Sequence, residues 1–241
     1  MNVNDPKITL LRTQVKAAWQ EFDMAVTFHE VWKPAAYDEG LHNRMGVSYA
    51  TNAFHVVRMA LRREMLLALM RLWDTDQRAV RMKSVAEALD DKNVINALAT
   101  DRASRIKMAG IEDEMRQCLS QQANEAIALV NKYSAKGSHG KVLENLKFLR
   151  DKHLAHKEIA ATGVSATDEE IESFYQDNSK LIQLLLSLVE AVAYDPEDAA
   201  RVYRFHAKFF WAGVRGERTE GHPNFRAPNE LPSSDSSRKS H

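Results

Sequence analysis

Arginine and histidine stand where leucine would be expected along one predicted helix, residues 141–158, KVLENLKFLRDKHLAHKE. At helical spacing, its apolar stripe passes through Val142, Leu146 and Leu149 and continues to His153 and His156. Arg150 also has apolar neighbours four residues away on either side. Charge on the packing side of a helix is costly, so this pattern favours a chemical role for these residues.

Arginine and histidine can cleave RNA without a metal, because RNA carries its own nucleophile, the 2′-hydroxyl. A histidine with a pKa near neutrality can remove the proton of this hydroxyl, or protonate the leaving 5′-oxygen. An arginine can bind the phosphate through two hydrogen bonds and stabilise the charge that builds on its oxygens. The products would be a 2′,3′-cyclic phosphate and a free 5′-hydroxyl. We therefore expect neither a metal nor a cofactor.

The composition indicates a globular protein without a nucleic-acid signature in its net charge. The chain has 241 residues, 44% of them hydrophobic, and Lys+Arg and Asp+Glu both number 33. A neutral protein can still carry a local basic groove, so RNA remains a candidate partner. The single Cys118 excludes an internal disulfide and suits a reducing compartment. With no apolar leader and no long apolar run, we expect a cytoplasmic protein without a membrane partner.

Helical periodicity dominates the chain and no alternating strand pattern stands out. The expected helices cover residues of about 6–33, 41–73, a short segment from Ser84, 101–133, 141–159, 167–194 and a last helix from Pro196. Lys33-Pro34 should end the first helix, because proline disfavours helix at the residue before it. Asp101 should cap the fourth helix. Ser84 with Glu87, and Thr167 with Glu170, have the spacing of capping boxes.

These helices predict an all-α fold, a single bundle of about six or seven helices covering residues 1–212. Its centre should include the Leu- and Met-rich stretch from Arg62 to Trp73. Residues 136–140, Lys-Gly-Ser-His-Gly, should form a loop before the motif helix. Residues 213–241 lack apolar periodicity and predict a disordered tail.

The stretch from Arg150 to His156, Arg-Asp-Lys-His-Leu-Ala-His, resembles the motif of the HEPN superfamily. That motif is an Arg, often followed by a polar residue, with a His four to six residues beyond. The helical layout and the Leu-Trp-Asp at residues 72–74 also resemble the HEPN proteins of abortive-infection phage-defence systems. The resemblance covers about residues 5–212 and is most specific in the motif helix.

The resemblance implies a metal-independent endoribonuclease, a toxin or phage-defence effector, with RNA as substrate. It implies a homodimer in which Arg and His of two protomers line one cleft. An antitoxin or another defence-system protein would be a further partner. The implied site residues are Arg150 and His156 as catalytic, Asp151 and His153 as supporting, and Lys152 and Lys157 as weaker RNA contacts. Six helical residues turn through about 240°, so Arg150 and His156 do not stack on one face, which is compatible with a site completed by a partner helix.

Two other Arg/His pairs fall within the motif's range of four to six intervening residues: Arg201/His206 has four, and Arg215/His222, in the predicted tail, has six. The implied site residues could instead have purely structural roles. Arg150 and Asp151 could form interhelical salt bridges, and His156 could sit near a helix C-terminus.

The second hypothesis for the whole chain is a catalytically silent helical dimer that serves as a binding or scaffold module. Some HEPN proteins are silenced by modification of a Tyr two residues after the motif His; Glu158 occupies that position here.

A cluster of aromatic residues lies near the end of the last helix: Tyr203, Phe205, Phe209, Phe210 and Trp211. We expect it in the core or at a dimer surface, with stacking on bases as the less favoured alternative.

Overall fold

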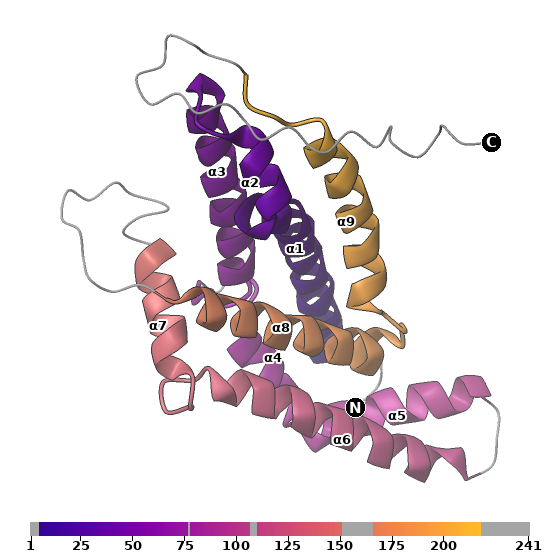
Figure 1. Cartoon of the computed structure of the whole chain (residues 1–241). Coiled ribbons are helices and arrows are strands. Elements are labelled where there is room, and N and C mark those ends of the chain that lie inside the picture. Colours follow the sequence, from indigo (N-terminus) through magenta and orange to yellow (C-terminus); the bar gives the residue numbers. More distant parts are fainter. Residues whose placement is uncertain (1–4, 77, 107–109, 151–165, 218–241) are drawn as a thin grey trace, which may run out of the picture. The chain divides into compact units, whose positions relative to one another are not determined.

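The protein is all-α in the residues that its computed structural model describes, 5–76, 78–106, 110–150 and 166–217 (Figure 1). The helices are α1 (Pro6–Tyr37), α2 (Glu39–Met45), α3 (Tyr49–Arg71), α4 (Met82–Leu89), α5 (Lys92–Ile106), α6 (Ile111–Lys132), α7 (Gly140–Leu149), α8 (Asp168–Leu185) and α9 (Pro196–Ala212). A short π-helical segment, η2 (Leu186–Glu190), extends α8. None of these helices is long and apolar enough to cross a membrane. The predicted fold class is confirmed, but six or seven helices is too low a number for the described part of the chain.

Turns at two glycines explain the additional helices. The predicted helix 41–73 is two helices, because the chain leaves α2 at Gly46 with φ 55°. The predicted helix 101–133 is also two helices, and α6 follows Gly110, whose φ of 80° is left-handed. Glycine adopts such angles without the steric cost that a Cβ would add. The helical periodicity of the sequence continues across such short connections, so the division was not visible in the pattern.

Three predicted helix boundaries were wrong. Pro34 lies inside α1, which continues to Tyr37; the carbonyl of Pro34 still accepts a hydrogen bond from the Asp38 N–H at 2.9 Å. Burial of the neighbouring Ala35 holds the helix together past the proline. Asp101 lies within α5 and pairs with Arg105 at 2.7 Å instead of capping a helix. Ser84 lies inside α4, which begins two residues earlier.

Two predicted helix starts are confirmed. Thr167 caps α8: its hydroxyl accepts from the Glu170 N–H at 3.2 Å, and the Glu170 carboxylate accepts from the Thr167 N–H at 2.9 Å. This reciprocal pair satisfies two backbone donors that a helix start leaves open. Pro196 opens α9, where a proline lacks no needed hydrogen bond.

The end of α8 departs from a regular helix. The predicted helix to residue 194 instead changes to the π-helical η2 and stops at Ala191, a non-glycine residue with φ 57°. The Arg102 guanidinium donates to the carbonyls of Ser187 and Leu188 in η2, the latter at 2.7 Å. Burial lowers the pKa of Arg102 below its ordinary value. The side chain thus replaces part of the backbone bonding that a regular helix would supply.

The chain forms two compact units. The first unit comprises the described residues up to Ala25 together with Leu66–Pro196, and the second comprises Val26–Met65 and the described residues from Glu197 onwards. Helices α1 and α3 each contribute to both units. Of the predicted tail, the structure describes only residues 213–217, and the division into a domain 1–212 and a tail stays a prediction.

The first unit contains α4 to α8, with α5 packed on α6 and α6 packed on α8 (Figure 1). The Leu- and Met-rich end of α3 lies in its core, as predicted. Its fully buried side chains include Phe22, Leu69, Met70, Leu72, Met82, Leu98 and Phe174. This core fixes the end of α3 and the start of α4.

The second unit has its own smaller core. Its buried members are Ala35, Leu41, Met45, Phe54, Ala207 and Trp211. Trp211 connects α9 to α1 by donating its indole N–H to the Val31 carbonyl at 2.8 Å. After α9 the chain turns back onto α2: the Gly216 N–H donates to the Arg44 carbonyl at 3.0 Å. A Cβ at Gly216 would lie 1.9 Å from the Met45 carbonyl oxygen, so only glycine fits this approach.

Candidate functional site

Arg150 directly follows α7 and keeps helical backbone angles, φ −57° and ψ −53°. Its N–H donates to the carbonyl of Leu146, so its position is set by the packing of α7. That helix buries Val142, Leu143 and Leu146, and the predicted apolar stripe is confirmed at Val142 and Leu146. Leu149 is only half-buried.

The loop before α7 fixes where that helix begins. A Cβ at Gly137 would lie 2.1 Å from the Asn131 carbonyl oxygen, and one at Gly140 would lie 2.3 Å from that of Ser134. The predicted loop at residues 136–140 is therefore a tight turn that folds back onto the end of α6. The His139 N–H donates to the Lys132 carbonyl at 2.8 Å and closes it.

The Arg150 guanidinium faces a carboxylate from the segment after α3. Its Nη1 lies 3.9 Å from Asp74 Oδ2, with a quarter of the Arg150 side chain and a third of the Asp74 side chain exposed. The other carboxylate oxygen, Oδ1, accepts backbone N–H groups of Thr75 at 2.6 Å and Asp76 at 3.1 Å. These two hydrogen bonds orient the carboxylate and leave Oδ2 directed at Arg150.

Trp73 anchors the chain immediately before Asp74. Its indole N–H donates to Asn178 Oδ1 at 2.9 Å, and the Asn178 amide in turn donates to the Phe174 carbonyl at 2.7 Å. Its ring lies 5.5 Å from that of Tyr133 and 5.8 Å from that of Phe174, measured between centroids. A buried indole with its N–H satisfied has little freedom to move, so Asp74 is held at a fixed point.

A second polar contact ties α6 to α8 behind this cluster. Asp177 Oδ2 accepts from the Tyr133 hydroxyl and from the Lys132 ammonium, both at 2.5 Å. Burial, followed by the hydrogen bond to Asp177, raises the pKa of the Tyr133 hydroxyl far above its ordinary value. Tyr133 therefore stays protonated and serves as a hydrogen-bond donor. Helix α8 thus holds the end of α3 through Trp73 and the end of α6 through Tyr133. The start of α7 is tied to the end of α6 by the His139–Lys132 hydrogen bond.

Five of the six site residues predicted from the sequence lie outside the described residues: Asp151, Lys152, His153, His156 and Lys157. The roles proposed for them stay predictions. Arg150 alone is described, and the structure adds Asp74 as its partner. The sequence signal for Asp74 was the Leu-Trp-Asp at residues 72–74, which by itself carried no role for the acid.

The alternative pair Arg201/His206 is described in full. Both side chains are exposed on α9, and the Arg201 guanidinium pairs with Asp198 one turn before it. Five helical residues turn through about 140°, so the two side chains point to different sides of α9. One chain therefore does not bring this pair to one phosphate. His222 of the third pair lies outside the described residues.

Metal-binding residues do not gather in the part of the chain that the structure describes. There, no group of three or more His, Cys, Asp or Glu side chains is placed to hold a metal ion. Cys118 is a free, exposed thiol.

Comparison with known protein families gives one match, which covers most of the chain and includes Arg150. Residues 9–210 match a HEPN-type domain of abortive-infection systems, and this range includes the whole motif segment. The family is AbiU2, and the chain belongs to it. Searches of curated proteins and of solved structures found no match.

Proposed function

We propose that the protein is a metal-independent HEPN-type endoribonuclease, a toxin or phage-defence effector. The observation that carries the proposal is Arg150 at the end of α7, held opposite Asp74, with Asp-Lys-His-Leu-Ala-His following inside the family match. Arg150 would bind the scissile phosphate and stabilise the charge on its oxygens. His156 would transfer protons to or from the 2′-hydroxyl and the 5′-oxygen.

The contact with Asp74 is compatible with phosphate binding. A guanidinium has five N–H donors in a planar fork, and Asp74 Oδ2 lies 3.9 Å from Nη1. A carboxylate near one corner helps to fix the plane of the group, and the planar fork of a guanidinium matches the geometry of a phosphate. In the proposed dimer, His156 of one chain meets Arg150 of the other, so that each cleft uses both protomers. Asp151 and His153 would support the pair, and Lys152 and Lys157 would contact neighbouring phosphates.

The test is cleavage of total RNA by the purified protein in EDTA. The wild type should cleave, and Arg150→Ala and His156→Ala should each lower the rate about 10²–10⁴-fold, the range for losing an oxyanion donor or an acid–base group. Arg201→Ala is the matched control: it removes an exposed helical arginine with a carboxylate partner and should leave the rate nearly unchanged. All three variants should remain folded.

Two results would replace the proposal. A wild type without any ribonuclease activity, whose expression also fails to slow bacterial growth, would favour the catalytically silent binding module. In that case the Arg150–Asp74 pair would be a structural contact only. Activity that disappears in EDTA would point instead to a metal-assisted reaction.

A further inference from the structure

Helix α9 carries three exposed phenylalanines: Phe205 and Phe209 lie on its outer face, and Phe210 packs edge-on against the buried Trp211 at 4.8 Å between ring centroids. The exposed fractions are 59% for Phe205, 62% for Phe209 and 58% for Phe210. The rings of Phe205 and Phe209 lie 4.8 Å apart between centroids. Of the aromatic cluster that the sequence placed in the core or at a dimer surface, only Trp211 is buried. A cluster of large apolar side chains that are more than half exposed is typical of a binding surface.

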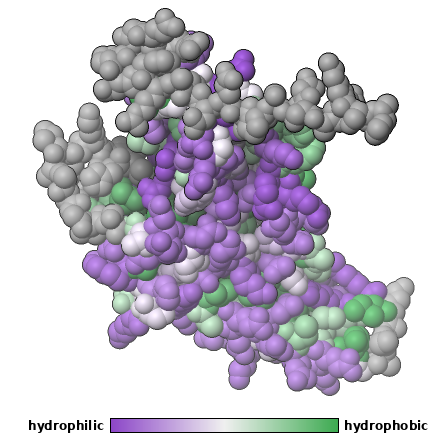
Figure 2. Space-filling view, in the orientation of Figure 1, coloured by the Kyte–Doolittle hydropathy of each residue, from purple (hydrophilic) through white to green (hydrophobic). Residues whose placement is uncertain are grey.

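The opposite face of α9 fixes these rings outward. Ala200, Ala207 and Trp211 are buried on the inner side, at helical spacing. Arg204 adds a polar clamp to α1, where its Nε donates to the buried Glu30 carboxylate at 2.8 Å. The rotation of α9 about its axis is therefore set, and Val202, Phe205 and Phe209 lie about 180° from the inner side. Figure 2 shows hydrophobic atoms beside the C-terminal half of α9.

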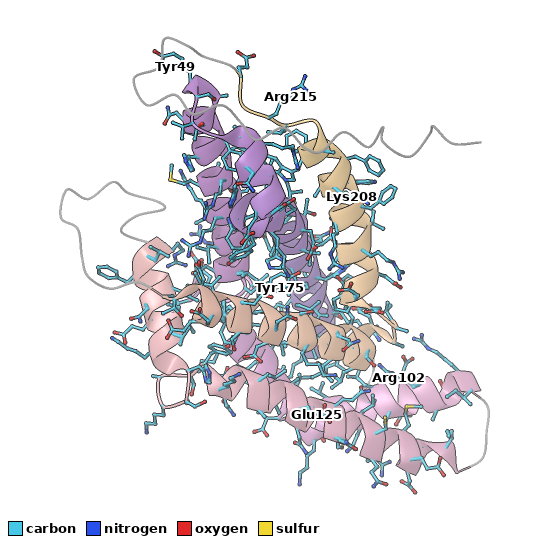
Figure 3. All side chains as sticks on the ribbon, viewed as in Figure 1. Tyr49, Arg102, Glu125, Tyr175, Lys208 and Arg215 are labelled. Carbon is cyan, nitrogen blue, oxygen red and sulfur yellow. The ribbon has the colours of Figure 1, made fainter. Side chains whose placement is uncertain are left out.

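Positive charge accompanies the phenylalanines at the C-terminal half of α9. Residues 199–216 contain no Asp or Glu. Arg201 and Arg204 pair with the acidic side chains Asp198 and Glu197 at the start of the helix. Lys208 and Arg215 lie toward the other end of this stretch, on and after α9 (Figure 3). The Gly216 hydrogen bond to α2 restrains the segment that carries Arg215.

We propose that Phe205, Phe209, Lys208 and Arg215 form a platform that binds single-stranded RNA. Bases stack on the phenylalanine rings, and Lys208 and Arg215 contact phosphates along the strand. Exposed aromatic rings beside cations are the combination that binds single strands without sequence preference. The identity of the strand as substrate rests on the proposed ribonuclease function, whereas its binding is measured separately.

The positive charge of the platform favours RNA over a second copy of the chain as its binding partner. In a symmetric contact through the α9 platform, the same patch of both copies would meet. Both copies would bring the positive Lys208 and Arg215 to this contact, where residues 199–216 contain no carboxylate and Glu217 is the first acidic residue after them. A phosphate backbone supplies the opposite charge that this surface lacks.

The binding experiment uses a fluorescent oligouridylate of about 12 nucleotides, within the length that such surfaces cover. Its 2′-O-methyl groups prevent cleavage, so anisotropy reports binding alone. Phe205→Ala and Phe209→Ala should each weaken binding of the full chain at least about fivefold, the lower end for losing one stacking contact. Phe209→Leu, which keeps an apolar surface, should weaken it similarly, while Phe209→Tyr should keep it. Lys208→Ala should lower the slope of log K against log salt by about 0.7.

The matched control is Tyr49→Ala on α3, because this aromatic side chain is 62% exposed outside the platform (Figure 3). It should leave RNA binding unchanged. Binding that survives both Phe→Ala substitutions, or that falls equally with Tyr49→Ala, would overturn the platform. A change of oligomeric state in light scattering, with RNA binding intact, would assign the face to a second copy instead. Failure of the ribonuclease proposal would look different: the strand would bind through the platform but total RNA would stay uncut.

Discussion

The guanidinium of Arg150, at the end of α7, lies 3.9 Å from the carboxylate of Asp74, three residues after α3. These residues are 76 positions apart in the sequence, yet both belong to the first unit. Asp74 is itself oriented by two backbone N–H groups and by the anchored Trp73 beside it. The contact therefore gives Asp74 a positioning role toward the proposed phosphate-binding arginine.

Asp74→Ala should lower RNA cleavage about 10- to 100-fold, the order of loss for a misplaced catalytic group. Stability should change by less than about 1 kcal/mol, because the pair is partly exposed and long. The rate of cleavage and the thermal unfolding of the same preparation measure the two effects. Asp76→Ala is the control, since Asp76 pairs with Arg78 on the surface. Equal losses in both variants would remove the positioning role.

Trp73→Phe should lower the free energy of unfolding by about 1–3 kcal/mol, because the Asn178 carbonyl loses its donor inside the core. Trp19→Phe, at a tryptophan that is 39% exposed, should cost less than about 0.5 kcal/mol. Chemical denaturation of the three proteins gives the comparison. Trp73→Phe should also reduce cleavage, since Asp74 follows the anchored ring. A variant as stable as the wild type would show that the hydrogen bond to Asn178 contributes nothing.

The second unit contains a buried carboxylate whose charge should make stability depend on pH. Burial by itself would raise the pKa of Glu30, but hydrogen bonds from His29 and Arg204 lower it below the ordinary 4.5. A carboxyl with a lowered folded pKa stabilises the fold fully above its unfolded value and loses this contribution as pH falls through the folded value. The wild type should therefore exceed Glu30→Gln in stability at neutral pH and lose the advantage below about pH 4.

Urea denaturation of both proteins across this pH range measures the difference. Glu197→Gln is the matched control, because it removes the exposed carboxylate that contacts the same Arg204. Its effect at neutral pH should be within about 1 kcal/mol, as for other surface pairs. If Glu30→Gln were as stable as the wild type at pH 7, the ionised Glu30 would not stabilise this unit.

Mixing two inactive variants tests the composite site of the proposed dimer. When Arg150→Ala and His156→Ala chains exchange subunits, half of the dimers should be mixed, and each mixed dimer has one intact Arg/His pair. Activity should return to about a quarter of the wild-type rate. No recovery after verified exchange would place both residues of a site in one chain. A protein that remains monomeric at micromolar concentration would exclude the dimer itself.

The sequence predicted the elements whose signals are local. The capping box at Thr167 and Glu170, the proline start of α9 and the buried Leu- and Met-rich end of α3 all agree with the structure. Turns that depend on a single glycine angle, at Gly46 and Gly110, did not appear in the periodicity. Pro34 misled the prediction, since burial of its neighbours outweighs the preference of a proline to end a helix.

Contacts between distant segments limited the prediction of the site. Arg150 was chosen for its spacing, and its neighbour Asp74 depends on how α3 and α7 pack, which no local pattern contains. The phenylalanines of α9 were placed in the core or at a dimer surface because aromatic residues at helical spacing usually pack. The inner face of α9 is already filled by Trp211 and small residues, and this leaves the rings outside.

Analysis of the cut RNA ends, with EDTA present, tests the central claim most directly. The wild type should leave 2′,3′-cyclic phosphates and free 5′-hydroxyls, because in the proposed reaction the nucleophile is the neighbouring 2′-hydroxyl and not a metal-bound water. Substrates with a 2′-deoxy group at the cleavage position should stay intact. Fragments with 5′-phosphates and 3′-hydroxyls, or cleavage that persists in both Arg150→Ala and His156→Ala, would contradict the account.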